Sequence, residues 1–366
     1  MKRFILLIIY IVFITTLNCK DISAVWVLPW SFSTEEAIDK MLLSLSKHNY
    51  NTLMAEIRYR ADAMYIPNRT DSTYTNLETR SHVLKGRDFD ALEYLIQQAT
   101  KYEIDVHAWM TMLVITPHNL DVLPKDHYYY GNADWITTDN TGKEMNRFNS
   151  EGYFLDAGIP EVKEHLLNIV SDVVVNYPQL KGIHLDYIRY PGQDSGHHPE
   201  AIEEFHKLGL TDNYANRMIW KEDNISDIVE SLFIRIKDLN PNILLSAAVV
   251  SDRFKARTQY SQNWLEWLEK GYIDNIYLMS YTKNDDVLNE ILKDKTIEPY
   301  KDKIVIGLRA WNESKKPYKA EKIYTKIKQV KKYGFAGTCL FNYSGLIRHK
   351  YLERLGFLLK KKERDA

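Results

Sequence analysis

The fold of this chain is decided by the stretch Gly182-Ile183-His184-Leu185-Asp186-Tyr187-Ile188-Arg189-Tyr190-Pro191. Apolar residues alternate along it as far as Leu185, which is the pattern of a buried strand. Asp186 follows where that strand is expected to end, and aromatic and basic side chains come directly after it. In barrels of parallel strands, residues that carry chemistry stand just beyond the last apolar position. The stretch therefore predicts a strand that ends in a functional carboxylate.

Short apolar runs of this kind recur eight times, and segments with helical signals separate them. The runs are residues 24–28, 52–57, 105–109, 182–185, 243–249, 275–279, 304–308 and 338–341. Helices are expected to begin after the capping residue Thr34, at Asp88, and at the first-turn proline Pro160. Parallel strands need helical crossovers, and eight of them close into a packed ring. The pattern thus predicts an α/β fold, a (β/α)₈ TIM barrel.

One domain is expected to fill residues 21–360, with a charged tail at 361–366. Two connections are long, residues 117–156 after the third strand and 191–240 after the fourth, and both are expected to shape a cleft. An open doubly wound sheet is the alternative arrangement. No G-x-G-x-x-G motif follows the first strand, so the main support for that alternative is missing.

Residues 1–18 have the features of an export signal. Lys2 and Arg3 precede an apolar or hydroxyl run over residues 4–17, which is shorter than the roughly 20 residues of a membrane-spanning helix. Cys19 ends this segment and resembles the lipidated cysteine of a bacterial lipoprotein. We expect an exported protein of the bacterial cell envelope that contacts the membrane only through a lipid on Cys19. An ordinary signal peptide with an incidental cysteine is the alternative.

Composition excludes several classes of protein. The chain has 366 residues with 48 basic and 49 acidic side chains, so it lacks the basic surplus of a nucleic-acid-binding protein. Only Cys19 and Cys339 are cysteines, which excludes a disulfide framework and a cysteine-rich zinc site. No glycine-rich phosphate cradle is present, and we expect no cofactor.

Two local clusters place histidine beside aspartate: Asp194 with His197 and His198, and His118 with Asp126 and His127. Neither cluster has the i, i+4 histidine pair of a helical zinc site. We expect these to be solvated loop residues and expect no metal.

Carboxylates, arginines and large aromatics gather where the predicted strands end, a mixture that suits a sugar. The expected stacking platforms are Trp30, Tyr65, Trp109, Tyr187, Tyr281, Trp311 and Tyr343. The expected hydrogen-bonding groups are Arg58, His184, Tyr190 and Asn342. Asp62 and Arg189 are also expected to contact the substrate. Trp26 lies further back in the first strand and is expected to be core.

Asp186 is the expected main catalytic carboxylate, either nucleophile or general base, and Arg189 would help to keep it ionised. A second carboxyl must protonate the leaving oxygen. The candidates for it are Glu56, Asp252 and Asp62. Glu56 ranks first because it lies at the mouth of the second strand; its alternative role is an ion pair with Arg58 or Arg60. The sequence leaves open whether the reaction would retain or invert the anomeric configuration.

The octapeptide HLDYIRYP at 184–191 resembles the signature of the glycosyl-hydrolase-like 10 family of bacterial proteins. Further segments that fit the family are residues 24–27, Arg58 with 62–65, 155–162, 274–281 and 337–343. This resemblance implies a (β/α)₈ barrel and a glycosidase that acts on a bacterial cell-wall glycan, with the glycan strands of peptidoglycan as the expected substrate.

Two other functions stay open at this point. The first is an envelope lipoprotein that binds glycan on the same fold without cleaving it. The second is a metal-dependent deacetylase of cell-wall sugars, which would need an aspartate and two histidines to converge. Two carboxyls that face one cavity would favour the hydrolase.

Overall fold

The computed structural model describes residues 21–117, 119–145, 151–312 and 318–363. The expected export signal, the lipidation site Cys19 and the cluster residue His118 lie outside these residues. Within them, no helix has the combination of length and apolar character that crossing a membrane requires.

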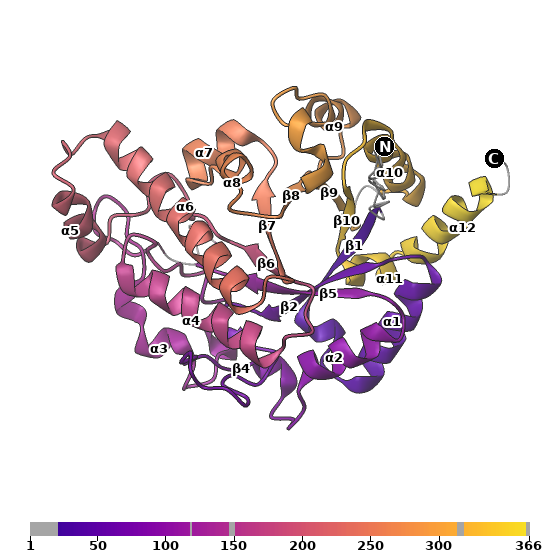
Figure 1. Cartoon of the computed structure of the whole chain (residues 1–366), viewed down its shortest axis with the longest axis horizontal. Helices are drawn as coiled ribbons and strands as arrows, with labels where there is room; N and C mark the ends of the chain where they lie inside the picture. The colour runs from indigo at the N-terminus through magenta and orange to yellow at the C-terminus, as the bar shows by residue number, and fades with distance from the viewer. Residues whose placement is uncertain (1–20, 118, 146–150, 313–317, 364–366) are drawn as a thin grey trace, which may run out of the picture.

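Eight parallel strands form a closed barrel at the centre of the molecule (Figure 1). They are β1 (Ile22–Val27), β2 (Thr52–Arg58), β5 (Asp105–Thr111), β6 (Gly182–Asp186), β7 (Leu244–Val250), β8 (Asn275–Met279), β9 (Ile304–Arg309) and β10 (Gly337–Phe341). Neighbours along the chain pair with one another, and β1 pairs with both β2 and β10, which closes the ring. This confirms the predicted (β/α)₈ barrel, and each predicted run overlaps one of these strands.

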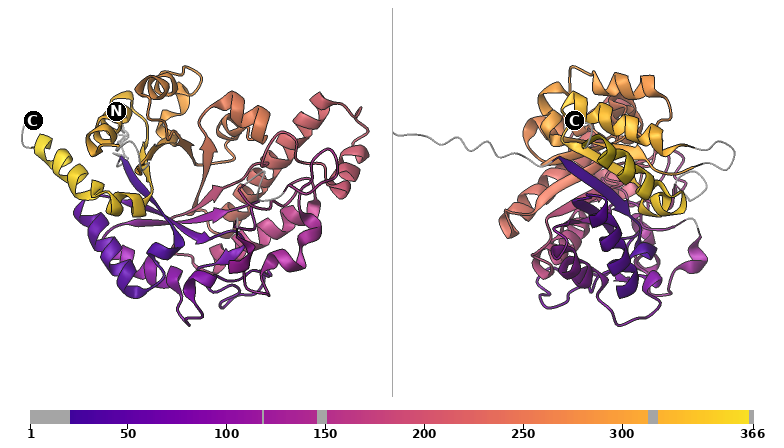
Figure 2. Two further views of the ribbon diagram at one scale, coloured as in Figure 1. Left: turned by 180° about the vertical axis from the view of Figure 1, so that it is seen from behind. Right: turned by 90° about the vertical axis from the view of Figure 1, so that its right-hand side faces the viewer.

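Helices surround the barrel on the outside, as the views in Figure 2 show. They are α1 (Glu35–Lys47), α2 (Ala91–Thr100), α3 (Tyr128–Gly131), α4 (Pro160–Asn176), α5 (Pro199–Lys207), α6 (Tyr214–Leu239), α7 (Arg253–Tyr260), α8 (Trp264–Lys270), α9 (Asp285–Leu292), α10 (Ala320–Tyr333), α11 (Tyr343–Arg348) and α12 (Tyr351–Glu363). Short 3-10 turns occur at η1 (Pro29–Ser31), η2 (His82–Leu84), η3 (Leu120–Val122), η4 (Ala133–Trp135) and η5 (Glu298–Lys303). Two short strands of two residues each, β3 (Asp62–Ala63) and β4 (Thr79–Arg80), extend the sheet beyond β2.

Local capping explains where the helices begin. The Thr34 hydroxyl accepts a hydrogen bond from the Ala37 amide before α1, and Pro160 is the first residue of α4, as expected. The start predicted at Asp88 is wrong: Asp90 caps α2, because its carboxylate accepts from the Glu93 amide at 3.0 Å. The last helix, α12, continues to Glu363 and so includes the first residues of the expected charged tail.

Side chains fill the interior of the barrel below its mouth. Trp26, Tyr277 and Cys339 are at most 1% exposed there. The Trp26 indole donates to His184 Nε2 at 3.0 Å, and His184 Nδ1 lies 2.9 Å from the Ser246 hydroxyl. Burial lowers the pKa of His184 well below its usual value, so the ring is neutral. His184 therefore belongs to the barrel core, not to the sugar-binding groups among which it was placed.

Position 307 on β9 requires a glycine because side chains already fill the barrel interior beside it. A Cβ at this position would lie 2.9 Å from the Trp26 ring and 2.8 Å from the Leu278 carbonyl oxygen. We expect Gly307→Ala to lower the free energy of unfolding by about 1–3 kcal/mol through overpacking. Urea unfolding measures this, with Gly131→Ala as control, because a Cβ at Gly131 meets nothing within 4 Å. Equal stability of the two variants would contradict the packing argument.

Candidate active site

A cavity of about 540 Å³ opens at the end of the barrel where the parallel strands finish. Its walls are formed by Trp26, Leu28, Trp30, Glu56, Tyr59, Arg60, Trp109, Glu151, Asp186, Tyr187, Arg189, Ala248, Val250, Met279, Tyr281, Trp311 and Phe341. Two carboxylic acids predicted from the sequence, Glu56 and Asp186, therefore face one cavity. Six of the residues expected to bind sugar join them: Trp30, Trp109, Tyr187, Arg189, Tyr281 and Trp311.

Asp186 is the last residue of β6, and both of its carboxylate oxygens are held. Oδ2 accepts from the Trp109 indole at 3.2 Å, and Oδ1 accepts from the Tyr187 amide at 2.7 Å. Tyr187 adopts a left-handed conformation with φ of 51°, a backbone strain that is common at functional sites. Burial raises the pKa of Asp186 to about 6, although these donors and Arg189 oppose the shift. Asp186 is thus mostly ionised at neutral pH.

Glu56 is buried on β2 and is only 3% exposed. Its Oε2 atom has no hydrogen-bond partner among the residues that the structure describes. Burial raises the pKa of Glu56 well above its usual value, and the nearby carboxyls of Asp186 and Asp62 add to the increase, while Arg60 opposes it. Burial therefore favours the protonated form of Glu56. Two acids whose environments separate their pKa values can act as acid and base.

A β-bulge separates Glu56 from Arg58. The pairing of β2 with β5 shifts between these residues, so they do not share a face as simple alternation predicts. Arg58 turns away from the cavity, is fully buried, and donates through Nε to both Glu78 oxygens at 2.8 and 2.9 Å. His165 Nε2 lies 3.2 Å from the same carboxylate. The sugar-binding role expected for Arg58 is replaced by this buried ion pair.

Arg60 lies at the cavity wall, where the sequence predicted only an ion-pair partner of Glu56. Its amide donates to the Thr111 hydroxyl at 2.8 Å, and its Nη1 donates to the carbonyls of Thr116 and Glu151. The guanidinium carbon lies 5.7 Å from the centre of the Tyr187 ring. Backbone carbonyls thus fix Arg60 at the cavity wall, and no carboxylate among the described residues forms an ion pair with it.

Glu151 is a cavity residue that sequence reasoning missed. It lies in the long connection after β5, and its Oε2 accepts from Arg189 Nη2 at 3.0 Å. The Arg189 guanidinium lies between the rings of Tyr187 and Tyr260, 4.9 and 4.7 Å from their centres. Nothing in the residue pattern around Glu151 marks it, because contacts from other parts of the chain position it.

Aromatic rings line much of the rest of the cavity. Tyr281 contacts Trp311 and Phe341, with ring centres 5.4 and 5.3 Å apart. Trp30 is 51% exposed at the rim, where its ring meets that of Tyr59. Trp26 is buried in the core as expected, but it also contributes to the cavity floor. The cavity therefore combines acids from β2 and β6 with aromatic rings from β1, β5 and β10 and from the connections that follow β8 and β9.

The remaining expected site residues lie elsewhere. Asp62 is 1% exposed and pairs with His82, and Tyr65 packs in the core against Tyr177. The Tyr190 hydroxyl lies in the core, 3.3 Å from an Asp156 oxygen.

Three further residues that were expected to contact substrate stand at the starts of helices. Asp252 caps α7 by accepting from the Lys255 amide at 2.9 Å, and Asn342 caps α11 by accepting from the Gly345 amide at 3.0 Å. Tyr343 follows as the first residue of α11 and packs, half-buried, against the core. None of these three lines the cavity.

In the described part of the chain, which leaves out His118, the residues of the two histidine clusters do not form a metal site. His127 is buried, in contrast to the solvated position expected for it, and its Nε2 lies 3.2 Å from the Arg60 carbonyl oxygen. His198 caps α5. Among residues 21–117, 119–145, 151–312 and 318–363, no three His, Cys, Asp or Glu side chains are grouped to hold a metal ion.

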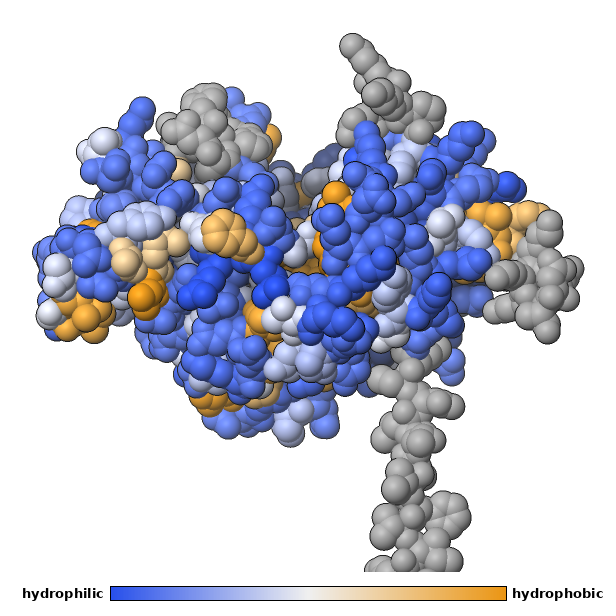
Figure 3. Space-filling view, turned by 90° about the horizontal axis from the view of Figure 1, so that it is seen from above, coloured by the Kyte–Doolittle hydropathy of each residue, from blue (hydrophilic) through white to orange (hydrophobic). Residues whose placement is uncertain are grey.

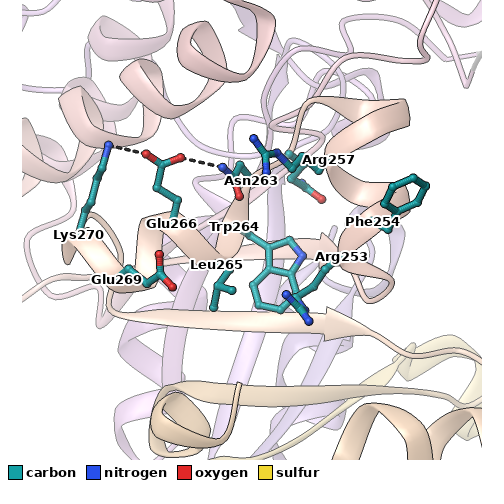
Figure 4. A pocket seen from close by; sticks show the side chains of 10 residues that line it. Arg253, Phe254, Arg257, Asn263, Trp264, Leu265, Glu266, Glu269 and Lys270 are labelled. Atoms are coloured by element: carbon teal, nitrogen blue, oxygen red, sulfur yellow. Dashed lines mark hydrogen bonds and ion pairs between the residues drawn. The ribbon is translucent and has the colours of Figure 1, made fainter. Parts of the chain in front are cut away.

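A second hollow of similar size lies outside the barrel between α7 and α8, and Figure 4 shows its side chains. Glu266 there is bonded to both Asn263 and Lys270, and Arg257 is paired with Glu222. These charged groups are already neutralised by one another, and neither Glu56 nor Asp186 reaches this hollow. The mouth of the barrel is therefore the candidate active site.

Comparison with known proteins identifies the family. The model of the family described as glycosyl hydrolase-like 10 matches residues 12–326. The chain belongs to this family, which confirms the resemblance found in the sequence. It is 24% identical over 208 residues to the glycosyl hydrolase YngK of Bacillus subtilis, and 22% identical over 309 residues to the glycosyl hydrolase DigH of Escherichia coli K12. These matches cover 56% and 75% of this chain, but only 38% and 65% of the relatives.

Solved structures share the fold. The glycoside hydrolase domain of PgaB (BpsB) from Bordetella bronchiseptica aligns with a TM-score of 0.69 over 92% of this chain and 98% of that chain, at 13% identity. An α-L-fucosidase from Paenibacillus thiaminolyticus aligns with a TM-score of 0.62 over 92% of this chain and 48% of that chain, at 11% identity. At these identities the likeness concerns the barrel architecture.

The buried pair of Glu78 and Arg58 makes stability depend on pH. Burial opposes the charged form of Glu78, but Arg58 and His165 outweigh it and lower the pKa of Glu78 to about 2. A carboxyl whose pKa is lower in the folded state stabilises above its unfolded pKa, so this contribution is present at neutral pH and is lost as the pH falls from about 4.5 towards 2.

We expect Glu78→Gln to lower the free energy of unfolding by about 3–5 kcal/mol at pH 7, because Arg58 is left as an unpaired buried charge. The difference from the parent should shrink as the pH approaches 2. Urea unfolding at pH 7, 4 and 3 measures it, with the exposed Glu298→Gln as control. A difference that stayed constant across this range would show that Glu78 is not the titrating group.

Proposed function

We propose that this protein hydrolyses glycosidic bonds in a bacterial cell-wall glycan, the glycan strands of peptidoglycan in particular, with Glu56 and Asp186 as its two carboxylates. The observation that carries the proposal is that both acids face one cavity in different environments: Glu56 is buried with Oε2 unpartnered, whereas Trp109 and the Tyr187 amide donate to Asp186. A protein that only bound glycan would use the aromatic wall but would have no need of a buried, protonated second acid.

Each acid takes the role that its environment favours. Glu56 donates its proton to the leaving oxygen, since burial keeps it protonated. Asp186, mostly ionised and held by Trp109 and Tyr187, is either the nucleophile or the base that activates water. The aromatic wall packs against the apolar faces of the sugar rings, and the guanidinium groups of Arg60 and Arg189 contact their hydroxyl groups.

We also propose that the protein is exported and anchored in the cell envelope through a lipid on Cys19. The basic start, the short apolar run and the cysteine of the first 19 residues support this proposal. A cell-wall glycan would then be within reach of the anchored enzyme. Labelling of cells with a radioactive fatty acid tests the anchor, and loss of label in Cys19→Ala is the expected result.

The acid pair predicts distinct defects in two variants. Asp186→Asn should lower kcat on glycan strands by at least about 10³-fold, because it removes the anionic carboxylate. Glu56→Gln should lower kcat about 10²- to 10⁴-fold on glycan strands, but far less on an aryl glycoside whose nitrophenol leaving group needs no proton.

Mass spectrometry of the products of purified glycan strands, with and without stem peptides, measures both effects. Val250→Ala, at the cavity wall, serves as a control for general disturbance. Cleavage by Asp186→Asn at the parental rate would overturn the assignment.

The pH profile is the second test of the roles. Asp186 must be ionised, so kcat/KM should fall as the pH drops through about 6, and it should fall again at high pH where Glu56 loses its proton. Trp109→Phe removes a donor to the anion, so the pKa of Asp186 rises and the acidic limb should move to higher pH. Trp311→Phe removes an indole that is not among the groups that shift the pKa of Asp186, so it should leave this limb in place. A limb that shifts equally in both variants would exclude the proposed role of Trp109.

A further inference from the structure

A separate cavity of about 340 Å³ lies at the start of α6 and shares no lining residue with the candidate active site. The same two connections build both cavities. The connection after β5 supplies Glu151 to the candidate active site and Asn140 to the cavity at α6. The connection after β6 supplies Arg189 to the candidate active site and Gln193 to the cavity at α6. The two segments that form the walls of the cavity at α6 therefore also contribute residues to the candidate active site.

Hydrogen bonds within the chain hold the inner wall of this cavity in place. Lys221 on α6 is 4% exposed, and its ammonium group donates to the carbonyls of Gln193 and Ser195 at 2.8 and 3.1 Å. Gly196 has a φ of 87°, and a Cβ on it would lie 2.7 Å from the Lys221 side chain. The Gly196 amide donates to the Thr137 hydroxyl at 2.9 Å, which ties the two connections together. The cavity is thus held in shape before any ligand binds.

The lining carries the groups that recognise a sugar. Tyr214 is 64% exposed, and its hydroxyl accepts a hydrogen bond from the Gln193 amide. Arg217 is held against Asp212 by two hydrogen bonds of 2.8 and 2.7 Å, and its guanidinium covers the Phe205 ring. Its Nη1 atom is buried without a hydrogen-bond partner in the part of the chain that the structure describes.

An anion is a poor match for this lining. The charge of Arg217 is neutralised by Asp212, and the Lys221 ammonium is surrounded by carbonyls. A ring with hydroxyl or acetamido groups fits better, because it offers an acceptor to Arg217, polar edges to the exposed amide side chains of Asn140 and Gln193, and an apolar face to Tyr214.

We propose that this cavity is a second sugar-binding site, which holds a distant unit of the same glycan strand that the candidate active site cleaves. This inference rests on the proposed function. Binding of one strand at two linked sites raises the affinity for long strands over that for short ones, because the second contact is intramolecular.

Calorimetric titration of the Asp186→Asn protein tests the proposal, because this variant would bind glycan without cleaving it. The probe is a preparation of purified peptidoglycan glycan strands freed of stem peptides. Tyr214→Ala in this background should raise the Kd for these strands about tenfold through loss of the stacking contact. Tyr214→Trp should preserve the affinity. Phe254→Ala is the matched control, because Phe254 is 78% exposed and lines neither of the two cavities.

Each result has a defined meaning. A higher Kd in Tyr214→Ala alone, with an unchanged melting temperature, supports the second site. An unchanged Kd, or an equal rise in Phe254→Ala, overturns it, and the proposed function stands if the parent cleaves the same strands. If the Asp186→Asn protein binds no strands and the parent cleaves none, the second site and the proposed function fall together.

Discussion

Closure of the strands into a ring is the constraint on which the rest of this structure depends. Because β1 pairs with both β2 and β10, all eight strands must finish around one opening. Residues that are as far apart in the chain as Trp30 and Phe341 thereby reach the same cavity.

The surface seen from above is largely hydrophilic, with small apolar patches and a hollow between two lobes at its upper edge (Figure 3).

The position of Trp109 shows how the ring organises the two acids. On β5 this residue pairs in register with Glu56 on β2, and its indole reaches across to Asp186 on β6. A single buried side chain therefore lies between two carboxyls and donates to only one of them. This asymmetry, together with the depth at which Glu56 is buried, gives similar chemical groups different preferences for a proton.

Sequence patterns predicted the barrel and the positions of both cavity acids, because strand ends are determined by local hydrophobicity and ring closure brings them together. The same reasoning misplaced residues whose direction depends on tertiary detail. Arg58 lies two positions after Glu56 and would share its face, but the bulge turns it into the protein. Glu151 could not be found at all, since contacts from Arg189 and Arg60 place it. Helix caps such as Asp252 use the same residue types as catalytic sites, so a cap and a catalytic acid have the same appearance in a sequence.

The parallel direction of the strands has a consequence for how the molecule would sit on a bilayer. Residue 22 begins β1 at the end of the barrel away from the opening, three positions after Cys19. The fatty acyl group that we propose for that cysteine would hold this end of the barrel near the lipid headgroups, with the opening directed outward. Strands of roughly 20 Å would separate the two, at about 3.3 Å per residue. On the function and anchor proposed above, the opening would face polymer lying above the membrane plane, and polymer would not have to reach the membrane surface.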